Sequence, residues 1–251
     1  MTGLLVLGSK PDPALPPPSS YDALACANAS GRSAARHGLP APAFTVMSAV
    51  LTSGKKAPND LALQALRGLR TETLYFYPRP GRSGDPLARA VHHLKTLRMQ
   101  PWYFKRAVRR LGYRFERFVD PGWDHYHRLV LDLCDHDAGI RRQIERKQPS
   151  TGMIALALGL AEPRYRRFIV SGFSFEISHA YADNPLIAER GTATSKHAET
   201  DVALLRHLAH KFNNVYTTEP TVHARAGVPY LEALAGAARE HGMEPRAVGA
   251  G

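Results

Sequence analysis

Short apolar runs alternate with helix-like patterns along most of the chain. Extended apolar runs predict strands at residues 4–8, 23–28, 44–50, 73–78, 168–173 and 215–218. Helical periodicity between and after them predicts helices at 58–69, 150–162, 198–212 and 229–242, and a short one at 30–38. Since parallel strands need helical crossovers, this alternation predicts an α/β domain with a mostly parallel sheet.

The middle of the chain, residues 85–147, departs from this pattern. It is basic and aromatic, and its apolar spacing predicts helices at 86–98 and 102–111. We expect a helical basic insertion or lid here, within one domain spanning residues 1–251.

Composition changes this picture little. The chain has 251 residues, of which 44% are apolar and 22% charged, as in an ordinary soluble globular domain. The chain has only two cysteines, Cys26 and Cys134, a number that excludes a disulfide scaffold, and both lie in apolar runs and are expected to be buried. The N-terminus lacks the features of a secretory signal, and no run has the roughly 18–20 apolar residues of a membrane span. A cytoplasmic protein is expected.

The formal net charge of +11 favours an anionic partner. Much of it lies in residues 105–117 and around 141–142 and 164–167. Nucleic acid, anionic lipid or a negatively charged substrate would fit such a surface, and a generally basic solvated surface would fit equally.

The clearest candidate anion site is the start of the buried helix. Ser150, Thr151 and Gly152 open it, and hydroxyls with backbone N–H groups at a helix N-terminus suit a carboxylate or phosphate. Plain helix capping is the alternative. Gly8 and Ser9 follow the first strand without the full dinucleotide-binding glycine pattern, so they indicate only a turn.

A second candidate is the segment 174–197, which follows a strand. It carries His179, Tyr181 and His197. Ligands of α/β sheets bind at the carboxyl ends of strands, histidine is the natural general base near neutral pH, and a tyrosine hydroxyl can donate to a departing phosphate. Surface or capping roles are the alternative for any one of them.

A third candidate is Asp135-His136-Asp137, whose spacing matches the Asp-x-Asp with which many glycosyltransferases hold a divalent metal. The same residues could form an ordinary polar helix end.

Two blocks of the sequence resemble the sialyltransferases of glycosyltransferase families 42 and 29. The first, PSTGMIALALGLAEPRYRRFIVSGFSF at 149–175, resembles the family block in which Ser/Thr-Gly opens a helix and a strand ends in Gly-aromatic-x-aromatic. The second, KHAETDVALLRHLAHKFNNVYTT at 196–218, resembles the block in which a histidine precedes a helix with paired leucines. LGSKPDP and CANAS, near the N-terminus, are weaker matches.

The resemblance implies a Rossmann-like, GT-A-like fold and metal-independent, inverting transfer from a CMP-activated acidic sugar, with no cofactor. It implies His197 as the general base and Tyr181 as the hydrogen-bond donor to the departing CMP phosphate, with His179 as a further candidate for that second role. It also implies a glycan or glycolipid acceptor, in bacterial surface polysaccharide or lipooligosaccharide assembly. Donor-binding residues would be Gly8, Ser9, Asn28, Ser150, Thr151, Gly152, Gly172 and Phe173.

The chain departs from the family at three places. Glu176 stands where the bacterial family has a tyrosine, Gly8-Ser9-Lys10 where it has Gly-Asn-Gly, and Ser48 where a second asparagine is expected. Sialic acid, Kdo and other 2-keto acid sugars all remain open as the donor sugar. Three alternatives stay open: a related nucleotide-sugar enzyme on the same scaffold, a metal-dependent transferase using Asp135 and Asp137, and a basic nucleic-acid-binding protein. The Trp102, Tyr103 and Trp123 rings in the basic segment also predict peripheral contact with an anionic membrane.

Overall fold

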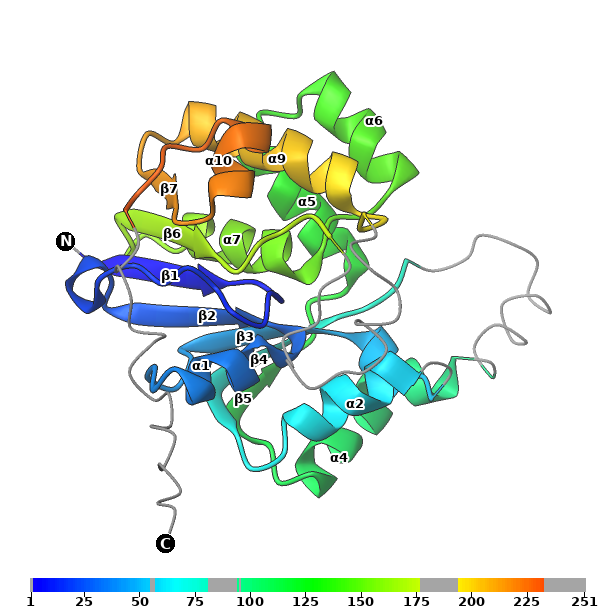
Figure 1. Cartoon of the computed structure of the whole chain (residues 1–251). Helices are drawn as coiled ribbons and strands as arrows, with labels where there is room; N and C mark the ends of the chain where they lie inside the picture. The colour runs from blue at the N-terminus through cyan, green and yellow to red at the C-terminus, as the bar shows by residue number, and fades with distance from the viewer. Residues whose placement is uncertain (1, 55–56, 81–93, 95, 177–193, 233–251) are drawn as a thin grey trace, which may run out of the picture.

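The structure, a computed structural model, describes residues 2–54, 57–80, 94, 96–176 and 194–232. Within these residues one sheet of seven parallel strands runs through the molecule in the order β5-β4-β3-β2-β1-β6-β7 (Figure 1). The strands are β1 (Gly3–Leu7), β2 (Ala23–Ala27), β3 (Phe44–Ser48), β4 (Arg70–Tyr77), β5 (Arg114–Val119), β6 (Arg167–Ser171) and β7 (Val215–Thr217).

Helices cover both faces of the sheet (Figure 1). One face carries α1 (Gly31–Arg36), α2 (Ala57–Ala65) and α4 (Pro101–Arg110). The other carries α5 (Trp123–Leu133), α6 (Ala138–Arg146), α7 (Thr151–Ala161), α9 (Ala198–Lys211) and α10 (Pro220–Ala226). Short 3-10 helices precede or follow several of these: η1 (Pro18–Ser20), η2 (Asn28–Ser30), η3 (Ala49–Thr52) and η4 (Leu97–Met99).

Burial explains the apolar pattern of the central elements. Every residue of β1 is buried, because strands on both sides and helices on both faces enclose it. Helix α7 is apolar all round because it lies between the sheet and the outer helices, where it contacts β1, β2, β3 and β6 as well as α5 and α9. Cys26 and Cys134 are free and buried, as expected from the sequence.

The predicted α/β architecture is confirmed, and the prediction for residues 85–147 needs correction. The expected helical insertion contains β5, which pairs in parallel with β4 and completes the sheet. Helix α5 packs on α7, so this part of the segment belongs to the main fold. Most of the helix predicted at 86–98 falls outside the described residues, and its end overlaps the 3-10 helix η4.

The C-terminal prediction also needs correction. Residues 220–226 form α10, which was not among the predicted helices. Pro220 starts this helix, and Gly227 ends it in the left-handed conformation. The helix predicted at 229–242 lies outside the described residues except for its start. There Tyr230 makes a bridge to Thr217.

The strand order fixes where a ligand can bind. The chain winds outward from β1 to β5 and then returns to place β6 on the other side of β1. Ligands of doubly wound sheets bind at this reversal, outside the carboxyl ends of the strands. None of the helices in the described ranges is long and apolar enough to cross a membrane.

Candidate active site

At the reversal of strand order, the loops after β1 and β6 are in direct contact. A Cβ at Gly8 would come within 2.4 Å of the Gly172 carbonyl oxygen, and one at Gly152 within 2.8 Å of the Phe173 ring. Phe173 is 6% exposed, and its ring packs beside both Gly8 and Gly152. These glycines therefore let two loops and the start of α7 approach closely. Contacts of Gly8, Gly172 and Phe173 with a nucleotide-sugar donor stay a prediction.

Asn28 joins three elements at the same edge of the sheet. It follows β2 with a φ of 51°, a left-handed conformation that asparagine tolerates. Its Nδ2 donates to Thr151 Oγ1 (2.8 Å) at the start of α7, and its Oδ1 accepts from the Ser48 N–H (2.9 Å) after β3. An amide can make further hydrogen bonds from both groups. Asn28 and Thr151, both predicted donor-binding residues, are thus brought together.

Residues 147–150, here called the 147–150 strap, lead into α7 and are held at each residue. The first turn of α9 holds three of them. Thr200 Oγ1 donates to the Lys147 carbonyl (3.1 Å), His197 Nδ1 bonds the Gln148 carbonyl (2.8 Å) and Asp201 accepts from the Ser150 N–H (2.9 Å).

The remaining contact of the 147–150 strap comes from the sheet. Tyr77, the last residue of β4, donates to the Pro149 carbonyl (3.3 Å), and its ring stacks on Trp123. The strap therefore ties His197 to the residues that lead into α7.

The hydrogen bond from His197 decides its tautomer. A carbonyl oxygen can only accept, so Nδ1 carries the proton and the neutral ring keeps its lone pair on Nε2. Burial lowers the pKa of His197, and the charges of Lys196 and Lys147 lower it further, against an opposing effect of the Gln148 carbonyl. The ring is therefore neutral at pH 7, which is the form that a general base requires.

Asp201 is a residue that sequence analysis did not single out. Its side chain is buried, and its carboxylate faces the N-terminus of α7 through Ser150. Burial raises its pKa to about 7, and the hydrogen bonds from Ser150 only partly offset this effect. Ser150 itself caps α7, since its Oγ accepts from the Met153 N–H. The capping alternative thus holds for Ser150.

Asp201→Asn should flatten the pH dependence of stability. Because the pKa of Asp201 in the folded protein, about 7, lies above the usual 3.8, the folded state binds this proton more tightly than the unfolded state. The stability it contributes is full below pH 4 and is lost as pH rises through 7. Asparagine keeps an oxygen for the Ser150 N–H and does not titrate.

Urea unfolding at pH 4 and pH 8 measures this effect. The difference in unfolding free energy between the two pH values should shrink by roughly 1–4 kcal/mol in the variant. Asp12→Asn, at an exposed aspartate, is the control and should leave the difference unchanged. An unchanged difference in Asp201→Asn would contradict the assignment.

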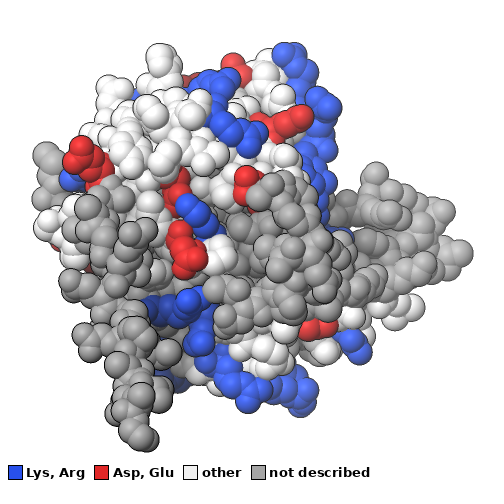
Figure 2. All heavy atoms as spheres, in the orientation of Figure 1, with Lys and Arg blue, Asp and Glu red and all other residues white. Residues whose placement is uncertain are grey.

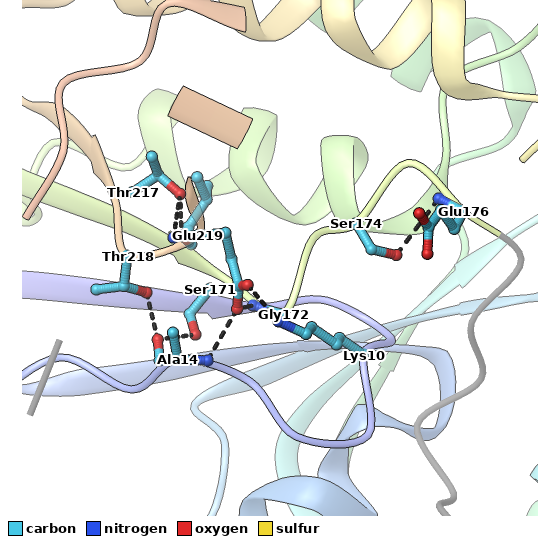
Figure 3. A network of polar contacts seen from close by, with 10 residues as sticks. Lys10, Ala14, Ser171, Gly172, Ser174, Glu176, Thr217, Thr218 and Glu219 are labelled. Atoms are coloured by element: carbon cyan, nitrogen blue, oxygen red, sulfur yellow. Dashed lines mark hydrogen bonds and ion pairs between the residues drawn. The ribbon is translucent and has the colours of Figure 1, made fainter. Parts of the chain in front are cut away.

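Glu219 organises the loops on the other side of the reversal point (Figure 3). Its side chain is 2% exposed, and it pairs with Lys10 Nζ at 2.7 Å. It also accepts from the Ala14 N–H (2.9 Å) and the Gly172 N–H (2.8 Å). One carboxylate after β7 therefore ties together the loops after β1 and β6.

Hydroxyl groups complete this network. The Ala14 carbonyl accepts from Ser171 Oγ (2.7 Å) and from Thr218 Oγ1, and the Glu219 N–H donates to Thr217 Oγ1 (3.1 Å). The result is a rigid rim beside Gly8 and Ser9.

A hollow of about 220 Å³ opens next to the 147–150 strap, between α6 and the start of α9. One of its lining residues, Lys196, directly precedes His197 in the sequence. Three of the lining side chains are cationic and one is acidic. Its lining residues are Gln143, Arg146, Lys147, Lys196, Glu199 and Thr200.

Several predicted residues are not placed. Tyr181 and His179 lie outside the described residues, so their roles stay predictions. The Glu176 N–H donates to Ser174 Oγ (3.3 Å; Figure 3). Glu176 also forms a bridge with Thr194, so the residues that flank the segment carrying Tyr181 and His179 lie side by side.

The Asp135-His136-Asp137 motif does not contribute to this site. Asp137 caps α6 by accepting from the Ile140 N–H (2.8 Å), and Asp135 pairs with Lys211 (2.6 Å). Lys211 ends the helix that begins after His197, so the motif lies about 20 Å from His197, at 1.5 Å per residue. In the described ranges no group of three or more His, Cys, Asp or Glu side chains could hold a metal ion.

A search of solved structures gives matches along nearly the whole chain. CstII, a sialyltransferase from Campylobacter jejuni in complex with the substrate analogue CMP-3FNeuAc, matches with a TM-score of 0.50 and 14% identity, over 93% of this chain and 88% of that one. The monofunctional alpha-2,3-sialyltransferase Cst-I from the same organism matches with a TM-score of 0.51 and 13% identity, over 90% and 79%.

The chain shares the fold of these two enzymes, an α/β fold with a seven-stranded parallel sheet flanked by helices. The resemblance seen in the sequence is thereby confirmed for the fold. No protein-family model matches the chain, and neither does any curated protein.

Proposed function

We propose that this protein is an inverting glycosyltransferase that moves a 2-keto acid sugar, such as sialic acid or Kdo, from a CMP-activated donor to a glycan or lipid-linked glycan. The observation that carries the proposal is the hydrogen bond from His197 Nδ1 to the Gln148 carbonyl, which leaves Nε2 as the basic nitrogen of a ring held at the strap before α7. The shared fold with two sialyltransferases supports it.

The reaction would proceed in one displacement. An acceptor hydroxyl oxygen attacks the anomeric carbon and gives its proton to His197 Nε2, while the bond between that carbon and the CMP phosphate oxygen breaks. CMP leaves with the bonding electrons, and the configuration at the anomeric carbon inverts. The chemistry needs a base for the hydroxyl and stabilisation of the departing phosphate, without a metal or cofactor.

In this proposal the described residues would meet the first need and part of the second. His197 is neutral because burial lowers its pKa. The first turn of α7, which Thr151 and Gly152 open after the Ser150 cap, would present the positive end of a helix to an anionic donor. Asn28 would hold the nucleotide from the carboxyl end of β2. Tyr181, or His179, would donate to the phosphate as it leaves.

The pH profile of the transfer reaction should reflect His197. The acid limb of kcat/KM should lie below about 6.5, the usual histidine value, because burial and two lysines lower the pKa of His197. Lys196→Gln removes one of these charges and should move the limb to higher pH. Lys211→Gln, at the far end of α9, should leave the limb in place. If Lys196→Gln leaves the acid limb in place, the limb does not reflect the ionisation of His197.

A direct turnover assay tests the proposed function. Purified protein is incubated with CMP-sialic acid or CMP-Kdo, a lactose-type acceptor and EDTA, and released CMP and glycan product are measured. Formation of an inverted product in EDTA supports the proposal. Turnover that requires a divalent metal, or activity with UDP- or GDP-sugars alone, would contradict it.

A further inference from the structure

One surface of the molecule combines exposed apolar and cationic side chains. Trp102 is 58% exposed and Leu97, just before α4, is 40% exposed. Arg106, Arg109 and Arg110 are exposed on the same helix. These five residues are called the α4 face below.

Helical spacing places the residues of α4 on one stripe. At 100° per residue, Trp102, Arg106, Arg109 and Arg110 fall within about 100° of one another. Phe104 and Val108 are fully buried and point to the opposite side, into the core around Phe76. The α4 face therefore projects away from the body of the protein.

The charge of this helix has one sign. Lys105 and three arginines lie between Pro101 and Arg110, with no acidic residue among them. Lys105 and Arg109 also lie over the rings of Phe118 and Phe115 on the edge strand β5. Figure 2 shows lysines and arginines gathered along the lower part of the molecule, where Figure 1 draws α4.

The sheet topology places the apolar end of the α4 face near the candidate active site. Helix α4 crosses from β4 back to the start of β5, and the two strands are parallel. The helix therefore starts at the carboxyl edge of the sheet, where His197 and Asn28 lie, and runs away from it. Leu97 and Trp102 are at this near end, and Arg109 and Arg110 at the far end.

We propose that the α4 face docks on an anionic lipid bilayer, with Leu97 and Trp102 entering the interface and the arginines contacting the headgroups. Indole rings prefer the membrane interface, and lysine and arginine bind anionic lipid. An exposed tryptophan and leucine beside the arginines favour lipid over nucleic acid. Trp123, expected on this surface from the sequence, is instead stacked on Tyr77 and His127.

Vesicle sedimentation tests this docking surface independently of any transfer activity. The whole chain is mixed with vesicles of neutral phosphatidylcholine, or of phosphatidylcholine with 30% phosphatidylglycerol, at low and high salt. Arg106→Gln/Arg110→Gln removes two charges from the α4 face. Arg141→Gln/Arg142→Gln removes two exposed charges from α6 and is the matched control.

We expect binding to the anionic vesicles alone, weakened by salt. The partition coefficient should fall about thirtyfold in Arg106→Gln/Arg110→Gln and little in the control. Trp102→Ala should lower it at least about tenfold. Equal losses in both double variants, no effect of Trp102→Ala, or binding to an oligonucleotide in place of vesicles would overturn the proposal.

Discussion

His197→Ala should lower turnover by about two to four orders of magnitude while CMP affinity stays nearly unchanged. The side chain is held at the strap that leads into α7, where its Nδ1 is already committed to the Gln148 carbonyl. Removing the ring removes the acceptor for the hydroxyl proton. It leaves Asn28, Thr151 and the start of α7 intact.

Two further variants separate catalysis from structure. His197→Asn can still donate to the Gln148 carbonyl but has no basic nitrogen, so it should be as slow as His197→Ala with an unchanged unfolding temperature. His210→Ala, at an exposed position near the other end of α9, should keep wild-type turnover. Wild-type rates in His197→Asn would remove this residue from the mechanism.

Glu219→Ala should lower the free energy of unfolding by about 3–5 kcal/mol. The carboxylate is 2% exposed, and its loss leaves the Ala14 and Gly172 N–H groups without this acceptor and Lys10 without its ion-pair partner. Because these groups belong to the loops after β1 and β6, the rim of the site should loosen as well. Equilibrium unfolding in urea measures the change.

Matched variants test whether the effect comes from the hydrogen bonds. Glu219→Gln retains an oxygen for the two N–H groups and loses only the charge paired with Lys10, so it should cost less than Glu219→Ala. Glu162→Ala removes an exposed carboxylate whose distance to Arg164 is 4.0 Å and should change stability by no more than about 0.5 kcal/mol. A loss below about 1 kcal/mol in Glu219→Ala would contradict the structural role.

The central architecture could be predicted because buried parallel strands and a buried helix leave plain apolar runs. Strands β1, β3 and β6 and helix α7 are of this kind. Strand β5 was missed because it is an edge strand. Its sequence, RFERFV, has exposed charges at three of six positions, so it reads as part of a basic segment.

The candidate site could be predicted in part. His197 and the Ser150–Gly152 turn were singled out by their positions in the sequence and by the family resemblance, and the 147–150 strap connects them, while their roles stay predictions. Asp201 and Glu219 were missed because their partners lie 51 and 205 positions away in the chain, as in the bonds to Ser150 and Ala14. A single acidic residue in a helix or after a strand carries no sign of such a contact. Conversely, the Asp135/Asp137 spacing suggested a metal site where the fold uses Asp137 as a helix cap.

The most direct test of the central claim is a calorimetric titration of the purified protein with CMP, in EDTA, with UMP and GDP as controls. The account predicts micromolar binding selective for CMP. It also predicts that binding is weakened in Asn28→Ala, whose amide joins the ends of β2 and β3 to the start of α7. No binding of CMP, or binding that appears only when a divalent metal is added, would contradict a CMP-sugar transferase.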